Sequence, residues 1–127
     1  MVSAWCVAAV LNGVVMPERG VAWADEVVTL IATPSCRDDA DCATIAVGAK
    51  ACGGPEAWLA WSRRVTDETA LRAAAARDAE EVRARLRAEG AVSDCRFVAD
   101  PGAMCVVGPE GDEGTCVLRP SGAGVPR

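Results

Sequence analysis

The sequence predicts a small α+β domain, in which one long helix packs on an antiparallel sheet of four or five strands and disulfides staple the layers together. Three observations lead to this fold class. A chain of 127 residues has room for one domain. Short apolar runs surround one long amphipathic segment, at residues 66–89. Seven cysteines are present, and the six that follow the first 24 residues give the even count of a disulfide framework.

Residues 1–24 are typical of an export signal. An apolar run at residues 4–16 precedes Ala22-Trp23-Ala24, which offers small residues at the two positions that a signal peptidase reads. We therefore expect cleavage before Asp25. The alternative is a buried N-terminal helix, because the first three residues carry no Lys or Arg and the start of an export signal is normally basic.

Cleavage at this position would leave residues 25–119 as one disulfide-stapled domain and residues 120–127 as a disordered, Pro/Gly-rich tail. The apolar run of the leader is too short for a permanent membrane anchor. We therefore expect an extracytoplasmic protein, either periplasmic or secreted.

Charge and composition exclude several classes of function. The formal net charge is -5, which argues against a general affinity for nucleic acid or for an anionic membrane surface. Histidine is absent, so the commonest general base and metal ligand are both missing. We expect no metal and no other cofactor, and a protein as the partner.

The first half of the expected domain reads mainly as strands. Three apolar or alternating runs predict strands at residues 26–32, 44–48 and 57–62. Gly53-Gly54-Pro55 separates the last two, and two permissive residues followed by proline predict a tight bend.

The long helix is predicted from Thr66, which can cap it, to the stop at Gly90. One apolar stripe recurs at helical spacing along it and should lie against the sheet. The stripe consists of Leu71, Ala75, Ala79, Val82 and Leu86. Beyond the helix, strands are predicted at residues 92–99, 103–107 and 115–118, with a hairpin loop between the last two.

Several segments occur together in one order: ADC, VGAKACGGPEAWLAWS and GAVSDC, followed by Cys105 and Cys116. This arrangement resembles a group of small exported bacterial proteins that carry a Cys-Gly-Gly-Pro core, an aromatic segment, a helix and a late cysteine pair. Trp58 and Trp61 stand where that group has tyrosines. The resemblance implies export, disulfides and an α+β fold, and it implies no activity.

The cysteines are interpreted as structural disulfides. There is no C-x2-C spacing, which argues against a zinc site. Cys105 and Cys116 flank a predicted hairpin and Cys36 and Cys42 flank a short polar loop, which leaves Cys52 for Cys95. The predicted bridges are therefore Cys36–Cys42, Cys52–Cys95 and Cys105–Cys116.

Two further groups of residues are candidate sites. Asp38, Asp39 and Asp41 could hold calcium, but the glycine and the distant glutamate of a calcium loop are missing, so a solvated loop is favoured. Ser62 or Ser93 could act with Lys50 as a Ser–Lys pair, although the sequence does not bring them together. We expect no catalytic residue.

Trp58 and Trp61 are the candidate interaction surface, and their alternative role is in the core. The function expected from all of this is an exported binding or interaction module of inhibitor-like character that presents a rigid loop. The alternative is an exported enzyme with a site that contains no histidine.

Overall fold

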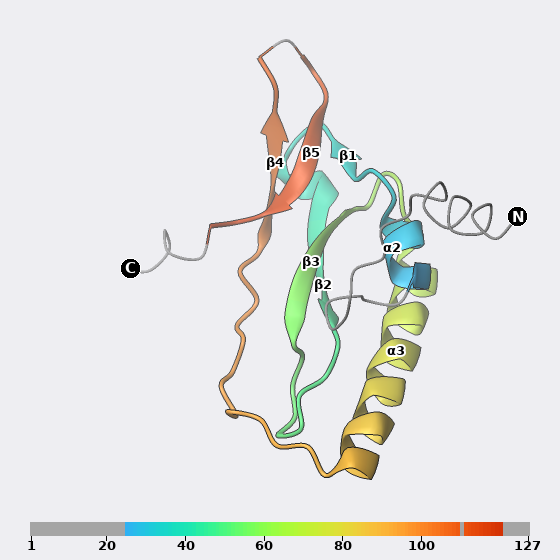
Figure 1. The fold of residues 1–127 in the computed structure, drawn as a ribbon. Coiled ribbons are helices and arrows are strands. Elements are labelled where there is room, and N and C mark those ends of the chain that lie inside the picture. Colours follow the sequence, from blue (N-terminus) through green and yellow to red (C-terminus); the bar gives the residue numbers. More distant parts are fainter. Residues whose placement is uncertain (1–24, 110, 121–127) are drawn as a thin grey trace, which may run out of the picture.

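The computed structural model describes residues 25–109 and 111–120, so the predicted leader and residues 121–127 of the predicted tail lie outside the described residues. The fold is α+β, as predicted (Figure 1). The elements in chain order are α2 (Asp25–Ile31), β1 (Ser35–Cys36), a 3-10 helix η1 (Asp39–Asp41), β2 (Cys42–Val47), β3 (Ala57–Ser62), α3 (Glu68–Glu89), β4 (Ala103–Val107) and β5 (Gly114–Leu118).

The strand predicted at residues 26–32 is wrong, because these residues form helix α2. Val27 and Ile31 are four positions apart, so they share one helix face, and both are buried in a core cluster with residues of α3. Asp25 and Glu26 lie in the first turn, where the helix dipole favours negative charge. The β-branched composition favoured a strand, but the buried positions follow the helical period.

The long helix predicted at residues 66–89 is confirmed as α3. Its cap is Asp67, whose carboxylate accepts two N–H groups of the first turn. Thr66 instead donates its hydroxyl to the Leu30 carbonyl at 2.7 Å, which joins the end of α2 to the start of α3. The helix ends at Gly90, whose φ of 65° lies in the left-handed region that glycine tolerates.

Only the first half of α3 is buried in the core. Leu71 is 0% exposed, and Ala75 is buried beside it, in agreement with the predicted stripe. Ala79, Val82 and Leu86 continue the stripe but are only half-buried, because α3 runs past the body of the strands towards its C-terminus (Figure 1).

The strands form two antiparallel sheets instead of one. One sheet has the order β1-β5-β4, and the other is the hairpin β2-β3. Gly114 begins β5 at a close approach, because a Cβ atom built there would collide with the Val106 carbonyl oxygen. The bend between β2 and β3 follows the prediction, with Gly53 and Gly54 both at positive φ.

The main core lies between the β2-β3 hairpin and the two helices. Ile45 and Val47 from β2 and Trp61 from β3 pack there against residues of α2 and α3. Trp61 is 0% exposed, so it belongs to the core and forms no part of a surface. The prediction that Trp61 forms part of an interaction surface is therefore wrong.

Two of the three predicted disulfides are wrong. The structure contains Cys36–Cys105, Cys42–Cys116 and Cys52–Cys95, so only the last follows the prediction. The predicted register of the hairpin is nevertheless correct, because Cys105 lies opposite Cys116 in the ladder. The β4-β5 hairpin packs on the start of β2, so Cys105 reaches Cys36 in β1 and Cys116 reaches Cys42, the first residue of β2.

The loop at residues 37–41 is closed without a disulfide of its own. Asp38 caps the 3-10 helix η1, and its carboxylate accepts the Ala40 N–H at 2.9 Å. Asp41 accepts the Arg37 N–H at 2.7 Å, and this bond is the main cause that lowers the pKa of Asp41 below its usual value. Local hydrogen bonds therefore close this loop in place of the predicted Cys36–Cys42 bridge.

Residues 92–99 do not form the predicted strand. They run without ladder pairing from the end of α3 along the outer side of the β2-β3 hairpin towards β4 (Figure 1). Cys95 interrupts any regular strand, because its φ of 58° is outside the extended region. Among the described residues, no helix combines the length and the hydropathy that crossing a membrane requires.

Candidate functional site

The segment at residues 92–99, called here the clamped segment, is held to the β2-β3 hairpin by three side chains. They are Cys52, which is bonded to Cys95; Lys50, whose Nζ donates to the Arg96 carbonyl at 2.9 Å; and Trp58, whose Nε1 donates to the Val98 carbonyl at 2.8 Å. All three come from the Gly-Gly-Pro bend or from β3 next to it. The bend therefore sets the position of the clamped segment.

Short-range bonds shape the clamped segment further. Ser93 Oγ accepts the Cys95 N–H at 3.1 Å, and Asp94 Oδ1 accepts the Arg96 N–H at 2.9 Å. The bond from the Arg96 N–H and the bond from Lys50 Nζ hold the pKa of Asp94 below its usual value. The conformation of the clamped segment is thus fixed by hydrogen bonds within the segment and by bonds from the β2-β3 hairpin.

Phe97 projects from the middle of this segment and is 79% exposed. The carbonyls on either side of it, at Arg96 and Val98, are the two that the hairpin holds. No described residue hydrogen-bonds to the N–H or the carbonyl of Phe97 itself. The Phe97 side chain and its unbonded N–H and carbonyl therefore lie between two carbonyls, those of Arg96 and Val98, whose positions the hairpin fixes.

Trp58 differs from Trp61 in its surroundings, as expected for positions on opposite faces of a strand. Its ring is half-buried, and its indole nitrogen makes the bond to Val98. Trp58 therefore supports the clamped segment from beneath, and the exposed aromatic group is Phe97.

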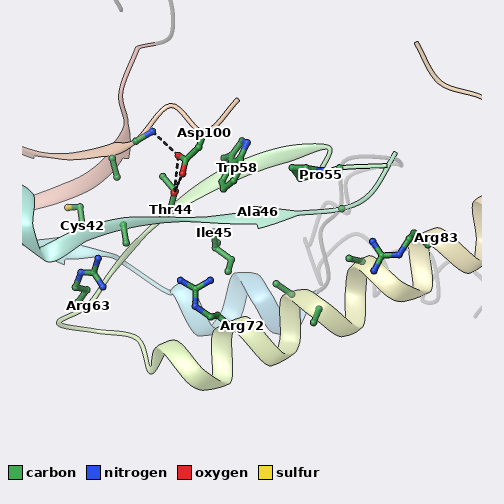
Figure 2. A pocket seen from close by; sticks show the side chains of 18 residues that line it. Cys42, Thr44, Ile45, Ala46, Pro55, Trp58, Arg63, Arg72, Arg83 and Asp100 are labelled. Carbon is green, nitrogen blue, oxygen red and sulfur yellow. Dashed lines mark hydrogen bonds between the residues drawn. The ribbon is translucent and has the colours of Figure 1, made fainter. Parts of the chain in front are cut away.

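A groove of about 800 Å³ follows the edge of β2 that is not paired with β3 (Figure 2). Arg72 and Arg83 border it from α3, while Trp58 and Asp100 border it on the opposite side of β2. Asp100 accepts the Thr44 hydroxyl at 2.9 Å and the Gly102 N–H at 2.9 Å. These bonds give its carboxylate a structural role, which is to hold the chain that leads into β4.

The arginines beside the groove are already engaged in ion pairs. Arg72 lies 2.7 Å from a Glu68 carboxylate oxygen, and Arg83 lies 3.0 Å from Glu80. All four side chains are largely exposed, so these pairs contribute little to stability. The groove is consequently less basic than its arginine content indicates.

The candidate calcium loop has structural partners. Asp39 accepts the Cys105 N–H at 2.8 Å and lies 3.5 Å from Arg119, so it joins η1 to the β4-β5 hairpin. Asp38 and Asp41 close the loop on itself, as described above. Each of the three carboxylates has its own partners within the protein, which supports the interpretation of residues 37–41 as a loop without a bound ion.

In both Ser–Lys combinations, the serine and the lysine form hydrogen bonds with other groups. Ser62 is buried, and its hydroxyl donates to the Ser35 carbonyl at 2.6 Å. Ser93 and Lys50 line one shallow pocket, but the Ser93 hydroxyl accepts the Cys95 N–H. Lys50 Nζ donates to the Arg96 carbonyl and to the Asp94 carboxylate, which gives it a structural role.

Three cysteine sulfurs, those of Cys36, Cys42 and Cys105, lie within 4.8 Å of one another. Such a cluster could hold a soft metal if its members were thiolates. Each is a member of a disulfide, however, and a disulfide sulfur is not a thiolate ligand. The cluster therefore joins the β4-β5 hairpin to the rest of the domain.

Comparison of the chain with protein-family models, with curated proteins and with solved structures found no match. The function must therefore be inferred from the geometry of the molecule.

The sequence reasoning missed Phe97, because residues 92–99 were interpreted as a strand. A usable signal was present in Ser93-Asp94, since short polar side chains favour local turns over strand pairing. Phe97 is also the single phenylalanine of the chain, and it follows a cysteine by two positions.

Proposed function

We propose that this protein is an extracytoplasmic binding module that docks on a partner protein through the clamped segment, with Phe97 as the anchor. The observation that carries the proposal is an aromatic side chain, 79% exposed, between two main-chain carbonyls that the hairpin holds in place. Aromatic anchors supply much of the binding energy at protein interfaces.

The fastening of the clamped segment supports a role in recognition. A loop that is ordered before binding loses less conformational entropy when it docks, so more of the contact energy appears as affinity. The Cys52–Cys95 disulfide and the bonds from Lys50 and Trp58 provide this order. Presentation of a rigid loop is the inhibitor-like behaviour expected from the sequence.

Three disulfides support a location outside the cytoplasm, because such bonds persist in oxidising compartments. The leader expected at residues 1–24 agrees with this location. The net charge of -5 favours a protein partner over nucleic acid or an anionic membrane. Periplasmic and secreted forms are both compatible with these features.

The test is differential capture from the periplasm and culture medium of the producing cells. The disulfide-bonded full chain is immobilised, and bound proteins are quantified by mass spectrometry for the native chain, Phe97→Ala and Val92→Ala. Val92 is 88% exposed on the same segment but outside the two clamped carbonyls, so it is the matched control. We expect one partner that Phe97→Ala loses and Val92→Ala retains; equal capture by all three proteins would contradict the proposal.

A further inference from the structure

Phe97 offers three groups together: a projecting side chain, a peptide N–H and a carbonyl. None of the described residues bonds to the last two groups. An endopeptidase uses this combination, because it binds the side chain in a specificity pocket and the main chain through hydrogen bonds. Its oxyanion hole receives the carbonyl of the same residue.

The neighbouring Arg96 does not offer these groups. Its N–H donates to Asp94 and its carbonyl accepts from Lys50 Nζ. A protease that selects basic residues would have to break both bonds before it could bind Arg96 as the specificity residue. The geometry therefore selects Phe97, and with it an apolar specificity pocket.

We propose that the partner is a serine endopeptidase with an apolar specificity pocket, which this chain inhibits by docking Phe97 as a substrate would. This inference rests on the proposed function and names the class of its partner. The bond presented to the catalytic serine is the peptide bond between Phe97 and Val98. The serine attacks the Phe97 carbonyl carbon, and the Val98 nitrogen is the leaving group, which takes up a proton from the enzyme.

The disulfides explain why cleavage would not release the segment. Hydrolysis adds one water across the bond and leaves a carboxylate on Phe97 and an amine on Val98. The part before the cut stays tied through Cys52–Cys95, and the part after it through Cys36–Cys105 and Cys42–Cys116. Trp58 also keeps its bond to the Val98 carbonyl, so the new ends stay close, and the Phe97 carboxylate and the Val98 amine can condense again with release of one water.

The experiment measures inhibition of chymotrypsin, which has an apolar specificity pocket, and of trypsin, which has an acidic one. The purified, disulfide-bonded full chain is titrated against each enzyme with a chromogenic peptide substrate. Phe97→Ala, Phe97→Arg and the control Val92→Ala are titrated in parallel, and circular dichroism checks that each variant is folded. Mass spectrometry follows cleavage after Phe97.

We expect inhibition of chymotrypsin that weakens at least about tenfold in Phe97→Ala and is unchanged in Val92→Ala. Phe97→Arg should transfer inhibition to trypsin. Equal inhibition by Phe97→Ala, inhibition of trypsin alone by the native chain, no inhibition of either enzyme, or turnover of the segment as an ordinary substrate would overturn the inference.

The capture experiment separates this inference from the function on which it rests. If Phe97→Ala loses a captured partner but no endopeptidase is inhibited, the docking function stands and the partner class is wrong. If Phe97→Ala captures the same proteins as the native chain, the docking function itself fails.

Discussion

Replacing the Cys52–Cys95 bridge by two serines tests how strongly the clamped segment is held. These residues are 43 apart in sequence, so the chain-entropy relation gives about 13 cal/mol/K, or about 4 kcal/mol at 25 °C. The Cys36–Cys105 bridge already encloses this loop and restricts the unfolded chain, which reduces the expected loss to about 3 kcal/mol. Both cysteines are changed together so that no free thiol attacks the remaining bridges.

Urea unfolding followed by far-ultraviolet circular dichroism measures the loss, and peptide mapping without reduction verifies that the other two bridges are native. A decrease of about 3 kcal/mol corresponds to a Tm lower by roughly 12–24 °C for a domain of this size. A decrease below about 1 kcal/mol would refute the reasoning, because it would mean that the bridge closes a loop already ordered in the unfolded chain.

Three other predictions concern the core, the clamp and pH dependence. Leu71→Ala removes a side chain that is 0% exposed and should cost about 2–5 kcal/mol in urea unfolding, whereas Leu86→Ala, on the half-buried part of α3, should cost clearly less. Trp58→Phe keeps an aromatic ring but removes the donor to the Val98 carbonyl; it should cost about 1 kcal/mol in the same assay, and an unchanged unfolding midpoint would contradict the clamp. Burial is the main cause that raises the pKa of Asp78 above its ordinary value of 3.8, so the folded state disfavours the charged form of this carboxyl group. The native chain should therefore lose stability as the pH rises from 3.8 through the raised pKa. Asp78→Asn should be more stable than the native chain at pH 7 and equal to it below pH 3.8.

The sequence predicted those elements whose signal is local. Helix α3 follows from its stripe and from Gly90, although its cap is Asp67 and not the predicted Thr66, and β3 and β4 begin and end at the predicted residues. The bend before β3 follows from its two glycines. Each of these features depends on residues close to one another in the chain, so short-range reasoning was sufficient.

The errors share a different cause, which is packing between distant segments. Val27 and Ile31 form a helix face because α3 provides a surface for it. Cys105 and Cys116 face each other as predicted, but the β4-β5 hairpin packs on the start of β2, where two other cysteines lie nearby. Phe97 is exposed between two carbonyls that Lys50 and Trp58 hold, and although Ser93-Asp94 favours a turn, the residues of this segment do not reveal these distant partners.

The pattern of the three bridges has a consequence for biogenesis. Each bridge joins a cysteine at or before position 52 to one at or after position 95. A chain that emerges from its N-terminus first therefore exposes three thiols with no native partner until helix α3 has followed them. Premature bridges among Cys36, Cys42 and Cys52 would have to be reshuffled, which takes seconds to hours and depends on isomerase activity. The yield of native protein should accordingly depend on a disulfide isomerase more than on an oxidant.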